Sequence, residues 1–215
     1  MKRFVLAAIA YAVFLAAVAG GWYLWEHRPS DDGPLDGGGG ITYGEPIDAG
    51  RAMSWGSALL TNLGTEPAVV ERARLLRSTA NLELLGVHSH LVGHGHTEKD
   101  QLLIGDRSGF PLERFPSRPL REQNVVRVPA EYLPNGSPAE GFQIVFGLRM
   151  AQPAGQPGLA GGSDVEVTYR VGSRRYREVY RYAIYLCAPE LDYYDYNHPC
   201  PPEEFRGKFE DRALG

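Results

Sequence analysis

The segment HSHLVGHGH, residues 88–96, contains four of the six histidines in the chain. Side chains alternate along a β-strand, so His88 and His90 would share one face of a strand that continues from LELLGV. The glycine-rich loop that follows could return His94 and His96 to the same place. Neutral imidazole binds zinc, copper and nickel. The spacing therefore predicts a metal site with three or four nitrogen ligands.

The competing interpretation of this segment is a solvated loop that is rich in histidine. A metallo-β-lactamase-like site would require Asp and His where this chain has Val92 and Gly93, and the glutamate of a cupin site is missing. Met53 and Met150 are the only methionines beyond the initiator, so zinc or Cu(II) fits better than Cu(I). Metal binding in the cell envelope is thus the second functional hypothesis.

Cys187 and Cys200 are the only two cysteines. In an oxidising compartment, a pair at this spacing most simply forms one disulfide that closes the segment APELDYYDYNHP. The alternative adds His198 to the two thiolates as zinc ligands, although zinc–thiolate sites usually use more closely spaced cysteines. The sequence predicts the disulfide.

A second candidate binding region lies near the end of the chain, where arginines and tyrosines are interleaved. Guanidinium groups recognise phosphate and carboxylate and stack on aromatic rings, so an anionic cell-wall polymer or lipid head group is a candidate partner. The interpretation that we favour from the sequence is intramolecular, with the acidic tail from Ala188 onward folded back over the arginines, because exposed arginines need no dedicated ligand. The residues concerned are Arg170, Arg174, Arg175, Arg177, Arg181, Tyr169, Tyr176, Tyr180, Tyr182 and Tyr185, and the acidic residues of the tail are Glu190, Asp192, Asp195, Glu203, Glu204, Glu210 and Asp211.

Sequence signatures of catalysis are missing. The chain has no G-x-S-x-G elbow, P-loop, H-E-x-x-H or dinucleotide-binding glycine pattern. The segment GDRSG, residues 105–109, is interpreted as a turn after QLLI, and no base can be proposed for its serine. We therefore expect a non-enzymatic protein without catalytic or cofactor-binding residues.

The N-terminal residues predict where the domain resides. The uncharged run from Phe4 to Trp25 has the length of a membrane-crossing helix. Lys2 and Arg3 favour leaving the short leading end in the cytoplasm and exporting the rest. Cleavage of a signal peptide after Ala19 is the alternative, and it also exports the domain. We expect a single-pass membrane protein with its C-terminal domain extracytoplasmic, in contact with membrane lipid through its helix and not with nucleic acid.

Composition and patterning divide the chain into four parts. These are an anchor at 1–28, a flexible Gly/Asp/Pro linker at 29–40, an exported β-sandwich at 41–188, and an acidic Tyr/Pro-rich tail at 189–215. The turn signals NLGTEP (62–67) and VGSR (171–174) predict that 53–62 pairs with 68–77 and that 164–171 pairs with 175–187. The expected strands are 41–48, 53–62, 68–77, 81–92, 101–104, 124–129, 142–151, 164–171 and 175–187.

Two of these segments carry a family resemblance. The run GSALLTNLGTEPAVVERARLL, residues 56–76, resembles the opening hairpin of immunoglobulin-like β-sandwich domains of exported bacterial proteins, and VEVTYRVGSRRYREVYRYAIYLC resembles their closing hairpin. The resemblance implies an all-β, antiparallel immunoglobulin-like sandwich, here preceded by a single transmembrane helix. Such motifs report fold and not activity. We expect a membrane-anchored domain that presents a sandwich surface to an envelope protein or a cell-wall component.

Overall fold

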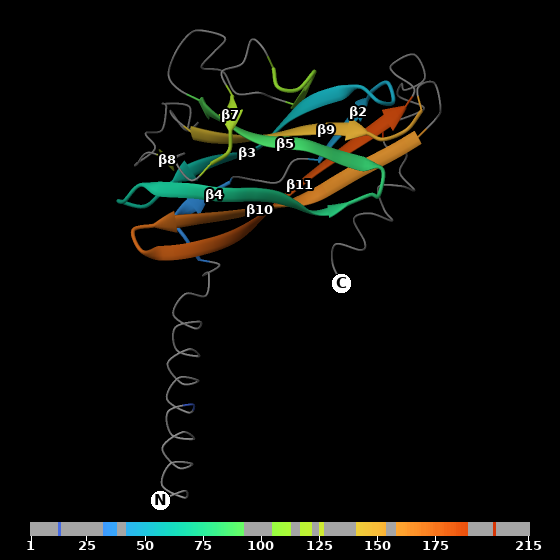
Figure 1. The fold of residues 1–215 in the computed structure, drawn as a ribbon. Coiled ribbons are helices and arrows are strands. Elements are labelled where there is room, and N and C mark those ends of the chain that lie inside the picture. The colour runs from blue at the N-terminus through green and yellow to red at the C-terminus, as the bar shows by residue number, and fades with distance from the viewer. Residues whose placement is uncertain are drawn as a thin grey trace, which may run out of the picture.

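The computed structural model describes residues 32–37, 42–92, 105–112, 117–121, 125–126, 141–153 and 158–188, together with Val13 and Cys200. Strands in these ranges form two sheets (Figure 1). The first, the β9 sheet, has the order β1 (Leu35–Asp36), β3 (Ala52–Asn62), β9 (Gly141–Met150), β5 (Leu82–Val92) and β7 (Arg118–Pro119), with β6 (Gly105–Ser108) also paired to β3. The second, the β10 sheet, has the order β2 (Thr42–Pro46), β11 (Arg174–Ala188), β10 (Gly158–Val171), β4 (Ala68–Ser78) and β8 (Val125–Val126).

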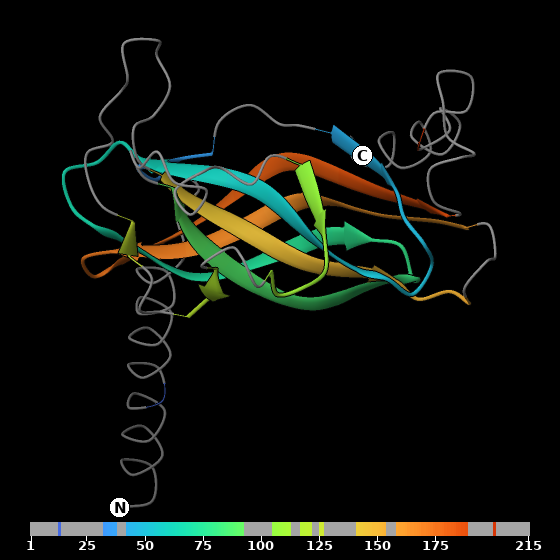
Figure 2. The same cartoon turned by 90° about the horizontal axis from the view of Figure 1, so that it is seen from above.

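The two sheets pack face to face as a sandwich, with one hydrophobic core between them (Figure 2). Alternate residues of β9, such as Phe142, Phe146 and Leu148, point into this core from one sheet. Val167 and Ile184 point into it from β10 and β11 of the other. All described pairings are antiparallel except that of β2 with β11, which is parallel. The predicted all-β class is confirmed.

One of the two predicted hairpins is wrong. β10 and β11 do pair across the turn at 172–173, from Val171 opposite Arg174 onward. β3 and β4, however, belong to different sheets, because β3 pairs with β1, β6 and β9 while β4 pairs with β10 and β8. The Asn62 side chain holds the turn between them by donating to the carbonyl of Glu66 (2.8 Å) and accepting from the amide of Gly64 (2.9 Å). The chain thus reverses but crosses to the facing layer, so that both strands bury a face in the same core.

The segment GDRSG also differs from its prediction as a turn. Gly105–Ser108 forms β6, an added strand that pairs with Met53–Gly56 of β3. The reversal falls only at Gly109, whose φ of 97° suits glycine and whose amide donates to the carbonyl of Ala52 (2.7 Å). The strand predicted at 101–104 lies outside the described residues.

The ordered structure begins earlier than Ile41, where the sequence placed the start of the folded domain. Leu35 and Asp36 pair with Asn62 and Thr61 of β3, within the region predicted to be a flexible linker. Leu35 is buried in the core. The glycines and aspartates around it in the sequence are typical of a flexible segment and gave no indication of this burial. We call residues 33–37 the N-terminal strap. The predicted membrane helix lies outside the described residues except for Val13, and no helix among the described residues is long and apolar enough to cross a membrane.

The predicted disulfide is confirmed. Cys187 at the end of β11 is bonded to Cys200, with 5.9 Å between their Cα atoms. Cys187 is completely buried, and its strand neighbours are Leu159 on β10 and Pro46 on β2. The bond therefore joins the tail to the longest strand of the β10 sheet. The rest of the tail lies outside the described residues.

Candidate functional site

The structure places two of the four clustered histidines on the outer face of the β9 sheet. His88 and His90 lie opposite Val145 and Gln143 of β9. His88 Nδ1 is 3.2 Å from Ser117 Oγ, and His90 is 2% exposed. His94, His96 and His198 lie outside the described residues. Among the residues that are described, no group of three or more His, Cys, Asp or Glu side chains could hold a metal ion, so the metal site stays a prediction.

His88 takes part in a packed cluster on this outer face. Its ring meets the ring of Phe110 edge-on, with 4.6 Å between centroids. Phe110 in turn lies over Gly86 and Gly147, and a Cβ at Gly147 would come within 2.4 Å of the ring. Burial lowers the pKa of His88 below its ordinary value of 6.5, which keeps the imidazole neutral at pH 7. The described contacts of His88 thus assign it a packing role.

The second candidate, the arginine-rich region, forms a continuous surface on the β10 sheet. Adjacent strands β4, β10 and β11 place Arg74 opposite Glu166, Thr168 opposite Arg177, and Arg170 opposite Arg175. These residues alternate with the core-facing ones, so they occupy the outer face of the sheet. We call its six arginines the arginine face. They are Arg72, Arg74, Arg170, Arg175, Arg177 and Arg181.

Two glutamates organise the arginine face, each shared by two guanidinium groups. Arg74 Nε donates to Glu166 Oε1 (2.6 Å), and Arg177 Nε donates to Glu166 Oε2 (2.6 Å). The second carboxylate is that of Glu71. Arg175 Nε lies 2.9 Å from its Oε2, and Arg170 Nε lies 3.3 Å from its Oε1. Each Arg–Glu–Arg triad keeps one positive charge. The carboxylates hold the guanidinium groups in place without neutralising the face.

The charge of this surface is opposite to that of the whole protein. Six arginines against two glutamates leave a formal excess of four positive charges on the arginine face, whereas the chain carries −4. The arginines stay accessible, since the side chain of Arg177 is 48% exposed, while the side chain of Glu166 is 5% exposed. Fixed guanidinium forks with accessible N–H groups are suited to phosphate and carboxylate ligands. The arginine face is therefore a candidate anion-binding surface, in which Glu166 and Glu71 hold four of the six guanidinium groups.

The tyrosines of the same hairpin do not belong to this surface. Tyr169, Tyr176, Tyr180 and Tyr182 belong to the core or pack against it, and the rings of Tyr169 and Tyr176 stack at 5.2 Å. Tyr185 is completely buried as well, but it alternates with the core residues Ile184 and Leu186 and therefore lies on the same side of β11 as Arg181. The other four tyrosines were grouped with the arginines because the sequence pattern was not divided into the two faces of the strand. Sequence reasoning also missed Arg72 and Arg74 on β4, although the alternation in VERARLLR carries that signal.

The triads predict a specific acid sensitivity. The hydrogen bond from Arg74, with a smaller contribution from Arg177, holds the pKa of Glu166 below its ordinary value of 4.5, although burial opposes this. As the pH falls, the Glu166 carboxylate is therefore protonated at a higher pH in the unfolded chain than in the folded protein. The stability that Glu166 contributes is therefore present above pH 4.5 and is lost as the pH falls through the folded-state pKa.

Below pH 4.5, we expect the free energy of unfolding of the E166Q variant to decrease less with falling pH than that of the unchanged protein. Urea unfolding across an acid pH series measures this dependence. E83Q is the control, because it removes a carboxylate from a pair with Arg149 whose side chains are 39% and 43% exposed. Identical acid slopes for E166Q and the unchanged protein would contradict the assignment.

Comparison with protein-family models gave no match, and no curated protein matches the sequence. The class of the protein is therefore defined by its own geometry. The described residues from 32 onward form an all-β, two-sheet domain that carries a disulfide and an arginine-rich outer sheet face.

Proposed function

We propose that this protein is a membrane-anchored, extracytoplasmic and non-enzymatic module that binds an anionic component of the cell envelope through the arginine face. The observation that carries the proposal is the placement of six arginines on one sheet face of an acidic protein. The resemblance to exported immunoglobulin-like domains and the disulfide support the extracytoplasmic location.

The geometry of the face favours an extended, multivalent anion. The arginines are distributed over three adjacent strands, and neighbouring strands are separated by about 5 Å. A polymer or surface with repeated phosphate or carboxylate groups would engage several guanidinium groups at once, whereas a single small anion would engage one triad. Multivalent contact of this kind raises affinity without requiring any single strong contact.

The test measures binding of the full-length protein, in a neutral detergent, to long-chain polyphosphate as the anionic probe. We expect the triple variant R72E/R175E/R181E to bind at least about tenfold more weakly, because charge reversal replaces attraction with repulsion across the face. Binding of the unchanged protein should also weaken as salt is raised. Fluorescence anisotropy of labelled polyphosphate gives the dissociation constants.

The matched control is R51E/R118E/R121E, which changes the net charge by the same amount at exposed arginines outside the arginine face. We expect this control to retain most of the binding. If both triple variants lose affinity equally, binding depends on net charge alone and the proposed site is wrong.

A further inference from the structure

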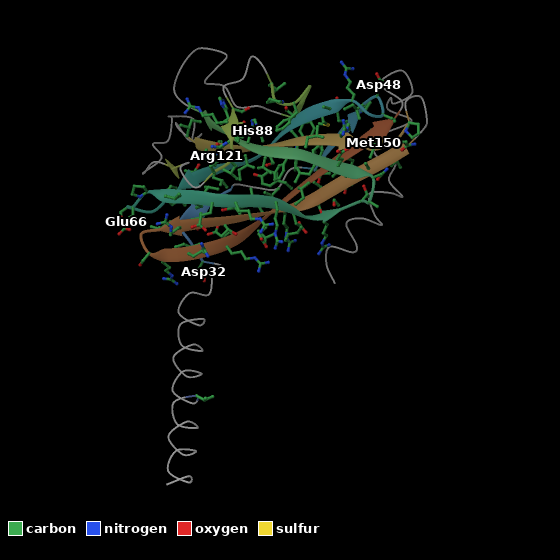
Figure 3. The ribbon with its side chains drawn as sticks, in the orientation of Figure 1. Asp32, Asp48, Glu66, His88, Arg121 and Met150 are labelled. Atoms are coloured by element: carbon green, nitrogen blue, oxygen red, sulfur yellow. A yellow bond between two sulfur atoms is a disulfide. The ribbon has the colours of Figure 1, made fainter. Side chains whose placement is uncertain are left out.

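We infer that the arginine face docks on the phosphate head groups of the bilayer that holds the N-terminal segment. This inference rests on the proposed function, since it names the anion that the face would bind. The first observation is where the chain enters the domain. The Gly33 amide donates to Glu178 Oε1 of β11 (3.0 Å), and Leu63 donates to the carbonyl of Pro34 (2.8 Å). Asp32 lies near the β10–β11 hairpin in Figure 3, and β1, which begins three residues later, is the edge strand of the β9 sheet. The chain therefore enters the domain at the end where the arginine-bearing strands β10 and β11 are joined.

The second observation is the short reach of the connection. The uncharged run ends at Trp25, and seven residue steps separate it from Asp32. An extended chain spans at most about 3.6 Å per residue, so this connection reaches at most about 25 Å. A domain anchored through this connection therefore stays close to the membrane surface.

The third observation is the mixed character of the arginine face. Val179 lies opposite Glu166, among the arginines, and is 47% exposed. Leu76 of β4, beyond Arg74 on the same strand, is 38% exposed. Exposed aliphatic side chains beside arginines fit a bilayer interface, where guanidinium groups meet phosphates and short apolar side chains reach the acyl boundary. A soluble polyanion would leave these two side chains in water.

The fourth observation is the charge asymmetry of the molecule. The chain carries −4 and the arginine face carries +4, so the remainder of the chain carries a formal charge of −8. An anionic bilayer attracts the face and repels the remainder, which orients the domain as well as binding it. The connection keeps the domain near the bilayer, and the charge asymmetry favours the orientation in which the arginine face meets it.

The experiment uses the full-length protein in nanodiscs with reporters at two positions. V179C lies on the arginine face, and D48C lies two residues beyond β2, at the end of the domain far from Asp32 in Figure 3, with its side chain 57% exposed. The native disulfide occupies Cys187 and Cys200, so a fluorophore attaches only to the introduced thiol. Spin labels on the lipid head groups then quench a fluorophore more strongly the closer it lies to the bilayer surface, and the extent of quenching is compared between the two variants. Nanodiscs of phosphatidylglycerol and phosphatidylcholine are compared with nanodiscs of phosphatidylcholine alone.

In the anionic nanodiscs we expect the label at V179C to be quenched at least about twofold more than the label at D48C, with the difference lost at high salt and in R72E/R175E/R181E. Equal quenching at both positions, or the same difference in neutral nanodiscs, would overturn the docking inference. If polyphosphate binding persists in that case, the proposed function stands and only the lipid assignment fails. Loss of both would overturn both.

Discussion

Replacing Glu178 with alanine is expected to lower the free energy of unfolding by about 3 kcal/mol and to release the N-terminal strap. The Glu178 carboxylate accepts hydrogen bonds from the hydroxyls of Tyr169 and Tyr180 and from the amide of Gly33. The Tyr180 hydroxyl also lies 3.1 Å from the carbonyl of Leu35, and Tyr182 donates to the carbonyl of Gly37. One carboxylate thus ties together β10, β11 and the N-terminal strap.

The size of this effect follows from the burial of the groups that lose their acceptor. Tyr169 is completely buried, and burial, followed by the hydrogen bond to Glu178, raises the pKa of both Tyr169 and Tyr180. A buried polar group left without a partner costs about 1–3 kcal/mol. E178A removes an acceptor from two hydroxyls and one amide, of which the Tyr180 hydroxyl keeps the carbonyl of Leu35. The strap also places Leu35 in the core, so its release exposes apolar surface.

Urea unfolding measures the loss of stability in E178A, and amide hydrogen exchange at residues 33–37 reports release of the strap. E66A is the matched control, because Glu66 is an exposed glutamate whose backbone carbonyl, and not its side chain, accepts from Asn62. We expect E66A to stay within about 0.5 kcal/mol of the unchanged protein. A loss in E178A no greater than that of E66A would show that the carboxylate does not hold the strap.

Breaking the disulfide is the second change with a large expected effect. The bond closes a loop with a sequence separation of 13 residues, and closure of a loop of this length stabilises by about 3 kcal/mol in the chain-entropy model. The fold itself should survive, because β11 is hydrogen-bonded to β10 and β2 along this segment, and the Ile47 amide donates to the carbonyl of Cys187 (2.7 Å).

C200S tests this prediction and leaves only a buried thiol at Cys187, where a small apolar side chain is tolerated. We expect a lower urea midpoint with unchanged far-ultraviolet circular dichroism. The unchanged protein should match C200S once a reductant is added, and C200S should not respond to the reductant. An unshifted midpoint in C200S would mean that the bond adds no stability to the described strands.

The sequence by itself determined the features that depend on short-range patterns. Alternation of apolar and polar residues predicted most of the long strands, because period-two patterning is a direct consequence of strand geometry. The disulfide was predictable since two cysteines in an oxidising compartment allow a single pairing. The hairpin of β10 and β11 was predictable because its turn joins two strands of the same sheet.

Only the tertiary structure decided which strands are neighbours and which residues share a face. A turn such as NLGTEP reverses the chain equally well within a sheet or between sheets, so β3 and β4 could not be assigned to different layers beforehand. Arg74 and Glu166 are 92 residues apart, and nothing local indicates that a strand pairing brings them together. The strap likewise depends on Tyr180, 145 residues beyond Leu35. The arginine face exists because long-range pairing aligns three strands, and that pairing is a property of the whole core.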